Sequence, residues 1–539
     1  MNEKGIDPRV ISRRSLLAGT AAALAAGAAV DLMPDARTEA STAAVPQENS
    51  QAPARTVKLS TDICVIGAAG AGLVAAAAAA EAGVKNVLVL EKMKETGGCA
   101  NVGVVGMFSV ESPVQKRLGI HISADEMFQH HMDMMTWNCN AKLVRNWYTT
   151  TGTVVDWLEK KGVEFGDVEP FTHERLYRTH HYVKNGWIGK ATVAATTKFL
   201  EAHGGVIRTE TRATKLLTDS NGDITGVVAT HGDEELRISA KAVILATGSI
   251  SGSDQLKARF YPGEDMSHVH IMGNLPWATG DGLIMAEEIG AGSTHVSTLF
   301  IGPHGHNTNE SVGTLMRRPN LIKVNKLGYR FTDEAIGVTR NYYPWMNCLA
   351  LDKQPDKVCY VLIDEATLRR FQKEKKSYAL FEAMAGPNWL EELDKGIPEE
   401  VQKSRVKIAN TWEEIAGYIG CDPGILKDTI SRYNSYCEDK YDAELLKDPE
   451  YLLPITAPPF YAMQGYSGID TCVGGIRANH NLEVVNRKDW PIKGLYAAGV
   501  AVGNWASIGY GPFGSCFSFA TFSGYAAGKN AAKFVLNKA

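Results

Sequence analysis

Short apolar runs that end in glycine recur along this chain. The first covers residues 62–66 (Asp-Ile-Cys-Val-Ile) and leads into the glycine-rich stretch 67–72. A helix-forming run over 73–82 follows, and a second apolar run over 86–90 closes on Glu91. Strand, glycine loop, helix, strand and terminal acid is the order of a dinucleotide-binding unit. We therefore expect globular structure from Lys58 onward, beginning with this unit.

The residues of this unit suit the two halves of a dinucleotide. Gly67 permits the tight turn, and Gly72 lets the helix and the strand pack closely. The helix N-terminus behind the loop attracts the pyrophosphate. Glu91 can accept hydrogen bonds from ribose hydroxyls and would repel a 2′-phosphate. The middle glycine of G-x-G-x-x-G is replaced by Ala69, with Gly70 beside it.

Four further glycine turns distinguish FAD from NAD. Gly97-Gly98 lies in the loop after Glu91, the apolar strand 242–245 ends in Ala246-Thr247-Gly248, and Thr279–Gly282 opens another helix. Near the C-terminus, the run 494–499 again passes from strand into glycine. A freely dissociating NAD needs only the first unit. The additional turns favour one long ligand held across the whole domain, which is FAD.

Composition is that of an ordinary soluble protein. The 539 residues can form two domains or more, and 56 Lys+Arg face 60 Asp+Glu without a long basic run, so no nucleic-acid partner is expected. The nine cysteines contain no C-x-x-C pair, which excludes a c-type haem attachment sequence and the usual cysteine ligand sets for metals. We expect reduced, mostly buried thiols and no metal site.

The first 55 residues have a different character. Ser12-Arg13-Arg14-Ser15 precedes an Ala/Gly/Leu-rich stretch, residues 16–30, that is too short and too weakly apolar for a membrane span. Residues 1–30 resemble a twin-arginine export signal, with a cleavage site near 26–28 and no following cysteine to accept a lipid. The alternative is a basic patch before a chance Ala-rich helix. Residues 31–55 are expected to be a disordered linker. The chain is thus expected to use the twin-arginine machinery and to be extracytoplasmic without a lipid anchor.

Together these motifs resemble a known family: the FAD-dependent flavoprotein subunits of soluble fumarate reductases, with urocanate reductases and 3-ketosteroid Δ1-dehydrogenases. The resemblance covers roughly residues 58–532. It rests on the units above and on Val324-Asn325-Lys326, Gly328-Tyr329-Arg330-Phe331 and Gly474-Gly475.

The resemblance implies an α/β fold. A Rossmann-like FAD-binding domain in two segments, 56–300 and 460–539, would carry an inserted α+β capping domain, 301–459. Ala457-Pro458-Pro459-Phe460 would be the linker between them. Non-covalent FAD is expected. A haem motif and an FMN domain found in some relatives are missing, so electrons are expected from a separate haem or flavin carrier.

The FAD contacts implied by the resemblance are Gly67, Ala69, Gly70, Gly72, Glu91, Lys92, Gly97, Gly98, Cys99, Ala100, Ala213, Ala246, Thr247, Gly248, Asp281, Cys472, Gly499, Val500, Ser515, Cys516 and Phe517.

Proton delivery is predicted from the cap. Fumarate reductases use an arginine acid there, and its best match is Arg340, displaced by about two positions, with a relay arginine at Arg317. The glutamate that links the pair falls on Thr314, which cannot carry a proton in the same way. A cap salt bridge is the alternative role for Arg340. Tyr342 and Tyr343 are rival proton donors, with Tyr343 preferred and Tyr342 also a candidate substrate contact.

The predicted substrate anchors depart from a dicarboxylate site. Fumarate reductases clamp a carboxylate with a histidine and an arginine, and these positions fall on Thr471 and on or beside Gly511. Charge-assisted bonds of about 1.5–3 kcal/mol each would be lost, so fumarate is an unfavourable substrate. In the ketosteroid enzymes, a tyrosine hydroxyl and a glycine N–H grip a ketone oxygen; those roles fall on Tyr510 and Gly514.

Aromatic and neutral polar groups before the helix at 192–202 favour a ring-containing substrate. Within residues 177–187 we select His181 and Trp187 as substrate contacts. The function expected from the sequence is an exported reductase of an activated C=C bond in a small organic acceptor, an enone or enoate. A ketosteroid-type dehydrogenase running in reverse, or a non-catalytic flavoprotein, remains an alternative.

Overall fold

The computed structural model describes residues 55–169, 177–262, 270–271, 277–304, 308–339, 350–375, 388–507, 511–512 and 514–537. All described residues belong to the unit Pro53–Ala539, so the predicted signal and nearly all of the predicted linker lie outside them.

The largest sheet among the described residues has eight strands. Its main path runs in the order β16 (Glu483–Val485), β17 (Pro491–Ala497), β9 (Glu234–Leu245), β1 (Arg55–Ile66), β2 (Val87–Leu90) and β6 (Val206–Arg208), while β7 (Thr211–Thr218) and β8 (Ile224–His231) continue from β9. β1 pairs in parallel with β2 and β9, and β17 pairs in parallel with β9. This confirms the predicted α/β fold. β1 begins at Arg55, earlier than the predicted strand at 62–66 and three residues before the expected start of globular structure at Lys58, because its outer half pairs with the first residues of β9.

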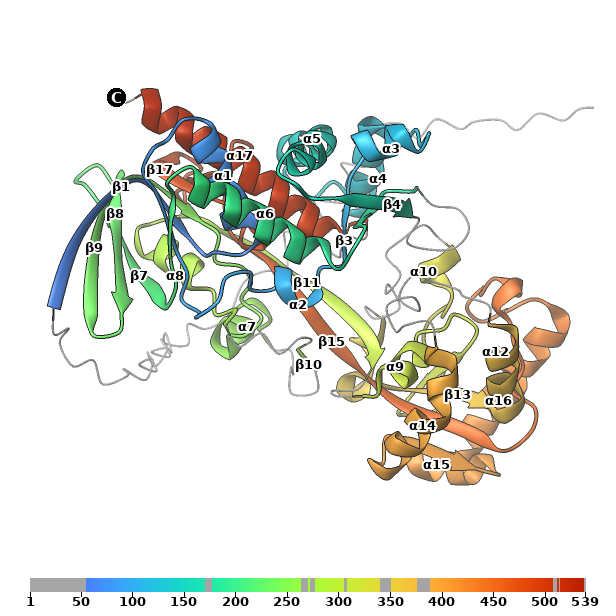
Figure 1. Cartoon of the computed structure of the whole chain (residues 1–539). Helices are drawn as coiled ribbons and strands as arrows, with labels where there is room; N and C mark the ends of the chain where they lie inside the picture. Colours follow the sequence, from blue (N-terminus) through green and yellow to red (C-terminus); the bar gives the residue numbers. More distant parts are fainter. Residues whose placement is uncertain are drawn as a thin grey trace, which may run out of the picture. The chain divides into compact units, whose positions relative to one another are not determined.

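Three helices accompany this sheet: α1 (Gly70–Glu81), α6 (Ile188–Ala202) and α17 (Ser515–Asn537) (Figure 1). Glycines in α17 allow a close approach to α1. A Cβ built on Gly524 would lie 2.4 Å from the Ala71 carbonyl oxygen, and one built on Gly528 would lie 2.2 Å from the Ala75 oxygen. The chain's last helix is therefore packed directly against the helix of the predicted dinucleotide-binding unit.

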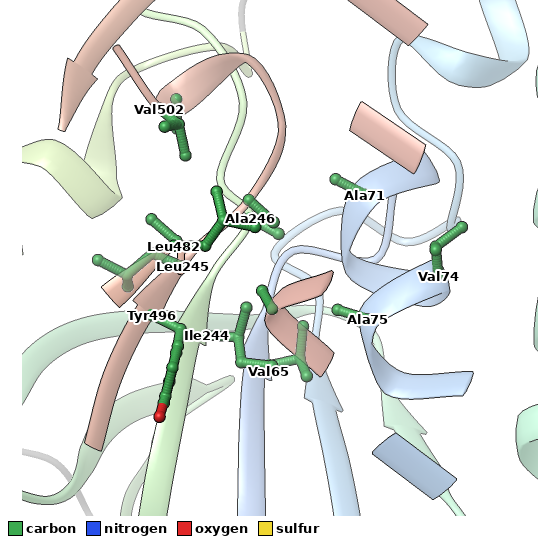
Figure 2. Packing of buried hydrophobic residues seen from close by; sticks show 14 of the residues in the cluster. Val65, Ala71, Val74, Ala75, Ile244, Leu245, Ala246, Leu482, Tyr496 and Val502 are labelled. Atoms are coloured by element: carbon green, nitrogen blue, oxygen red, sulfur yellow. The ribbon is translucent and has the colours of Figure 1, made fainter. Parts of the chain in front are cut away.

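The core under α1 is apolar and built from residues distant in sequence. Figure 2 shows Val65 of β1 and Ile244 of β9 on the side of Ala75 of α1, with Leu245 farther away towards Leu482. All are buried. Small side chains on α1 keep this helix close to the strand ends, which is where a ligand binds in folds of this kind.

A small third sheet precedes α6. It has the order β3 (Gly106–Phe108), β5 (His180–Val183) and β4 (Phe165–Glu169). The neighbouring helices are α2 (Ala100–Gly103), α3 (Pro113–Arg117), α4 (Ala124–Met134) and α5 (Ala141–Glu159). Side chains cap three of them: Ser112 at α3, Ser123 at α4 and Asn140 at α5 each accept a hydrogen bond from a first-turn N–H.

A second sheet is organised around one long strand, β15 (Phe460–Ile476) (Figure 1). β15 pairs with β10 (His270–Ile271), β11 (Ser293–His304), β13 (Val358–Asp364) and β14 (Val406–Ala409), and β13 pairs with β12 (Ile322–Asn325). The predicted boundary after residue 459 falls at the start of β15, whose first residues pair with β13 and β14. The sheet therefore continues past that boundary, and the domain limits stay a prediction.

The remaining described helices are α7 (Asp254–Phe260), α8 (Asp281–Glu288), α9 (Glu310–Met316), α10 (Ile336–Thr339), α12 (Glu365–Glu374), α14 (Trp389–Gln402), α15 (Trp412–Ile419) and α16 (Pro423–Asp439), with 3₁₀ turns at Pro355–Lys357, Pro449–Tyr451 and Gly499–Ala501. Within the described part of the chain, every helix is too short or too polar to cross a bilayer.

A buried charge cluster follows β12. Arg330 donates to Glu334 at 3.0 and 3.2 Å and to Asp442 at 2.9 Å, while Lys447 Nζ lies 3.1 Å from Glu334. All four side chains are fully buried. Burial raises the pKa of Glu334, but the charges of Lys447 and Arg330 outweigh it and lower that pKa to about 2. The cluster therefore joins the β12 turn to the segment after α16 through ion pairs that water cannot screen.

Breaking this cluster should destabilise the fold strongly. Arg330→Met leaves two carboxylates buried without their main partner, so we expect a loss of about 3–5 kcal/mol in the free energy of unfolding. Because the Glu334 pKa falls on folding, its stabilisation is complete above its ordinary pKa near 4.5 and disappears as the pH falls towards about 2. Urea unfolding at several pH values measures both effects.

Arg369→Met is the matched control. Arg369 pairs with Glu365 and Asp394, but its side chain is 53% exposed. A loss of less than about 1 kcal/mol is expected there. Equal losses for Arg330→Met and Arg369→Met would contradict the importance of the buried cluster.

Candidate active site

The glycine-rich loop forms a cradle between β1 and α1. Gly67 has φ of +105°, and a Cβ built on it would lie 2.3 Å from the Ala246 carbonyl oxygen at the end of β9. A Cβ on Gly72 would lie only 1.8 Å from the Gly67 carbonyl oxygen. The α1 cap residue, Ala69, offers no capping side chain, and the first turn contains no acid. This uncapped helix N-terminus fits a pyrophosphate.

Glu91 holds the cradle together from the end of β2. Its Oε2 accepts a hydrogen bond from the Ala68 N–H at 2.9 Å, and its Oε1 accepts one from the Met93 N–H at 2.9 Å. The side chain is buried. Each carboxylate oxygen retains capacity for a second hydrogen bond, so the predicted contact with ribose hydroxyls is compatible with this geometry.

Glu91→Ala should therefore reduce FAD occupancy for two reasons: the loop loses its tie to Ala68, and the ribose loses an acceptor. We expect the protein to retain less than about half of its FAD after desalting, given roughly 1–3 kcal/mol for the lost buried hydrogen bonds. The ratio of flavin to protein absorbance measures this. Glu95→Ala, an exposed acid on the same loop, is the control. Full occupancy in Glu91→Ala would remove Glu91 from the site.

Lys92 and Asp281 form a second polar group near the cradle. Lys92 Nζ donates to Asp281 at 3.0 Å and to Thr279 Oγ1 at 2.7 Å, and Arg212 donates to the same carboxylate at 3.1 Å. Burial raises the pKa of Asp281, but the Lys92 charge and the hydrogen bonds from Thr279 and Arg212 lower it overall. The sequence did not single out Arg212. It neighbours the predicted contact Ala213, which is buried in β7.

Several other predicted cofactor residues surround the cradle. Ala69 forms a parallel bridge with Gly97, and Gly98 adjoins it, since a Cβ there would lie 3.4 Å from the Ala69 Cβ. Gly70 lies against the Phe517 ring, since a Cβ built on Gly70 would be 2.6 Å from a ring carbon. A Cβ built on Gly499 would lie 2.9 Å from the Ala71 Cβ. Residues from five separate parts of the chain therefore meet at the N-terminus of α1.

The turn that follows β9 contributes another polar side chain to the site. Thr247 has a buried hydroxyl without a hydrogen-bond partner in the described structure, which fits a position that a ligand completes. The Cys472 N–H donates to Ser249 Oγ at 3.0 Å, linking the residue after Gly248 to β15. Ala100 and Ser515 are buried, Val500 and Cys516 are half-buried, and Cys99 is exposed.

The cysteines that the structure describes differ in exposure. Four are buried (Cys64, Cys359, Cys437, Cys472), three are intermediate, and Cys99 is exposed.

The predicted substrate loop is described at Gly511, Pro512 and Gly514. Gly514 has φ of +84°, and a Cβ there would lie 2.5 Å from the Phe108 nitrogen and 2.9 Å from His180 Nδ1. Its carbonyl oxygen accepts a hydrogen bond from the Phe108 N–H at 3.3 Å. A glycine is required at this position by both conformation and space. Tyr510 lies outside the described residues.

His181, a predicted substrate contact, is a buried residue of β5, and its role stays a prediction. The ring is fully buried, Nδ1 donates to the Thr179 carbonyl at 2.9 Å, and Nε2 lies 2.7 Å from Ser112 Oγ. Burial lowers its pKa to about 4. The alternation of β5 directs the neighbouring His180 towards Gly514 instead. A strand pattern over 180–183, recognised in the sequence, could have separated the two histidines.

Trp187, the other substrate contact predicted in this region, also stays a prediction. It is the N-cap of α6 and is 38% exposed, with Lys190 Nζ 5.1 Å from its ring centre. Thr471 is half-buried in β15, opposite Leu299 of β11.

The candidate proton relay is only partly described. Arg317 caps the C-terminus of α9 and is half-buried, and Thr314, on the same helix, is fully buried. Arg340, Tyr342 and Tyr343 lie outside the described residues. Their roles stay predictions.

A dinucleotide cradle closed by the chain's last helix, together with a glycine loop entering that helix, defines an FAD-dependent oxidoreductase. A family model for the FAD binding domain matches residues 62–516, and the chain belongs to this family. FAD is its cofactor, as the sequence predicted.

Relatives named as reductases match most of the chain. A vinyl phenol reductase of Lactiplantibacillus plantarum is 29% identical, over 88% of this chain and 97% of its own length. A urocanate reductase of Eggerthella lenta is 28% identical, over 87% of this chain and 74% of its own length. The predicted family resemblance is confirmed.

Solved structures agree with the fold. The open conformation of a flavocytochrome c3 fumarate reductase is 27% identical, with a TM-score of 0.67, and covers 90% of this chain and 79% of its own. A 3-ketosteroid Δ4-(5α)-dehydrogenase from Rhodococcus jostii shares the fold, with 23% identity and a TM-score of 0.69. The match covers 88% of this chain and 97% of the dehydrogenase.

Proposed function

We propose that this protein reduces an activated C=C bond in a small, ring-containing organic acceptor. The observation that carries the proposal is the neutral character of the predicted anchor positions: Thr471 and Gly511 supply no charge for a substrate carboxylate. One relative that is matched over 97% of its own length is a vinyl phenol reductase, whose name combines a ring with a vinyl group. An aromatic enone, enoate or vinyl phenol fits this site better than fumarate.

In this proposal, bound FAD supplies the hydride chemistry. The uncapped α1 N-terminus holds its pyrophosphate, and Glu91 holds a ribose. Tyr510 and the Gly514 N–H bind a carbonyl or comparable oxygen of the acceptor and stabilise the negative charge that develops there. Arg340 delivers a proton to one carbon of the C=C bond, and Arg317 then returns a proton to Arg340. Tyr343 or Tyr342 is the competing acid.

A screen of acceptors tests this function. The purified protein is reduced anaerobically with a viologen, and reoxidation of the flavin is followed after addition of fumarate, urocanate, cinnamates, a vinyl phenol, or steroid and lactone enones. We expect ring-containing acceptors to reoxidise it far faster than fumarate. Fast reoxidation by fumarate alone would overturn the proposed substrate class. Reoxidation by none of them would favour the non-catalytic alternative.

The same preparation tests the cofactor's attachment. FAD is expected to be released on denaturation, at about one per chain, because no covalent link is implied by the predicted contacts.

A separate haem or flavin protein is the proposed electron donor. Keto-steroid oxidation, the reverse reaction, is tested by adding a saturated ketone to the oxidised enzyme with an artificial electron acceptor.

Export through the twin-arginine route is part of the proposal and rests on Ser12–Leu17. Arg13→Lys together with Arg14→Lys should retain the protein inside the cell, folded and loaded with FAD, since this route carries folded proteins. Fractionation followed by flavin fluorescence measures the outcome. A second double variant, Arg37→Lys with Lys58→Arg, alters basic residues outside the signal and should be exported normally. Continued export of the first variant would show that another route reads the signal.

A further inference from the structure

Asp281, the first residue of α8, is saturated with hydrogen bonds from the protein itself. Its Oδ1 accepts from Thr279 Oγ1 at 2.8 Å and from Arg212 Nη2 at 3.1 Å. Its Oδ2 accepts from Lys92 Nζ at 3.0 Å and from Arg212 Nε at 3.3 Å. A carboxylate offers about four lone-pair directions, and these four bonds use all of them. Asp281 therefore has no acceptor position left for a ligand.

Lys92 keeps a donor that the described protein groups do not use. A lysine ammonium has about three N–H groups to donate. Two of those of Lys92 reach Thr279 Oγ1 at 2.7 Å and Asp281 Oδ2 at 3.0 Å. The side chain is 24% exposed, so a ligand can reach it. Of the two predicted cofactor contacts in this group, Lys92 is the one that retains a hydrogen bond to give.

The group adjoins the pyrophosphate cradle on two sides. Lys92 directly follows Glu91, whose Oε2 accepts from the Ala68 N–H of the glycine loop. A Cβ built on Gly282, the second residue of α8, would lie 2.3 Å from Thr247 Oγ1 in the turn after β9. The group pairs one carboxylate with two cations, which leaves a positive charge at the edge of the cradle. That charge favours an anionic oxygen of the cofactor.

Arg212 fixes the plane of the Asp281 carboxylate. Its Nε and Nη2 bind both carboxylate oxygens, a bidentate arrangement that arginine offers and lysine does not. Arg212 comes from β7, which lies beside α8 (Figure 1). A carboxylate held at both oxygens cannot turn away from Lys92. Arg212 therefore determines, through Asp281, where the Lys92 ammonium lies.

We propose that Arg212 is a positioning residue for FAD: through Asp281 it holds the Lys92 ammonium so that the unused N–H donates to a phosphate oxygen of the bound cofactor. Asp281 is then a support for Lys92 and not itself a cofactor contact. The inference concerns FAD, which is the cofactor of this family, and it does not depend on the proposed substrate or on the residues that would reduce it.

The rate at which FAD leaves the holoenzyme tests this role. Each purified protein is diluted until released FAD does not rebind, and the rise in free flavin fluorescence is followed. Arg212→Met should accelerate release by about 5- to 10-fold, the scale of one charge-assisted contact at a partly exposed site. In a Lys92→Met background the same change should alter the rate by less than about twofold, because the ammonium to be positioned is already gone. An equal acceleration in both backgrounds would overturn the proposal, since Arg212 or Asp281 would then bind FAD itself.

Two further variants separate the bidentate contact from charge and from general damage. Arg212→Lys keeps the charge without the planar pair of donors, so it should recover less than about half of the loss. Full recovery would show that charge alone suffices, against a positioning role. Arg237→Met is the matched control, because Arg237 lies in β9 of the same sheet, pairs with Glu235 and is 55% exposed, close to the 53% of Arg212. Its release rate should match the wild type, and an acceleration equal to that of Arg212→Met would reject a specific role for Arg212.

Salt provides a readout that a merely structural arginine would not change. Release from the wild type should accelerate with ionic strength, because salt screens the contact between Lys92 and a phosphate oxygen. Arg212→Met should respond less, since its ammonium is no longer held at that oxygen. An unchanged salt response in Arg212→Met would overturn the proposal. The measurements on Arg212→Met and Arg212→Lys need no change at Lys92, so they decide the question even where Lys92→Met retains too little FAD to study.

Discussion

Gly72→Ala should yield a protein that no longer holds FAD. The new Cβ would lie 1.8 Å from the Gly67 carbonyl oxygen and 3.2 Å from the Ala246 Cβ. The first obstacle is backbone, so no side-chain rotation relieves the contact. Either the glycine loop or the start of α1 must move, and both form the pyrophosphate cradle. We expect occupancy to fall below about a tenth of the wild-type value, since overpacking of this kind costs about 1–3 kcal/mol or more at the site that must bind.

The measurement is the flavin-to-protein absorbance ratio after desalting, with circular dichroism to establish that the chain is folded. Gly417→Ala is the matched control. Gly417 lies inside α15, where a Cβ would meet nothing within 4 Å, and alanine favours a helix there. Retention of FAD by Gly72→Ala would show that the loop can rearrange, and the cradle assignment would lose its main support.

The dinucleotide unit could be predicted because its signals are local. The apolar run 62–66, the glycines at 67–72 and Glu91 are close in sequence, and each has a physical role that its residue type fixes. The helix start was less well predicted: α1 begins at Gly70, whereas the helix-forming run begins at Leu73. Glycines in a first turn lower helix propensity, but packing against α17 outweighs that preference.

The residues that sequence reasoning missed depend on contacts between distant segments. Arg212 reaches Asp281 across 69 positions. No periodicity within one segment carries such information. The proximity of His180 to Gly514 was missed for a different reason: His180 and His181 lie in one short strand, and neighbouring residues of a strand point to opposite faces.

The linker predicted at residues 457–460 stays a prediction. Two prolines in a linker-like context suggested a passage between domains, and Phe460 begins a long strand that pairs with β13 and β14. Composition detects a break in regular structure, but it does not show which strands pair after the break. The position of the capping domain's boundary therefore depends on pairing partners that lie far away in the sequence.

Substitutions of Arg340 and Tyr510, which have different proposed roles, should give the largest changes in activity. If Arg340 delivers the proton, Arg340→Gln should lower acceptor reduction by about 10²–10⁴-fold, the usual contribution of a positioned acid. Flavin reduction by viologen should remain intact, because that half of the reaction needs no proton from the cap. Stopped-flow measurement of the two half-reactions separates these effects.

Tyr510→Phe should differ in kind from Arg340→Gln. It removes one hydrogen bond to developing negative charge, so turnover should fall by about 10²–10³-fold, as for a single oxyanion donor. Tyr510→Phe should also shift the preference among acceptors towards compounds that need no hydrogen bond to a carbonyl oxygen. Arg340→Gln should not cause this shift. If Arg340→Gln stays active while Tyr342→Phe or Tyr343→Phe is inactive, the acid is a tyrosine. The neutral anchors at Thr471 and Gly511 would then be matched by a neutral acid, and the site would work as the ketosteroid-type enzymes do.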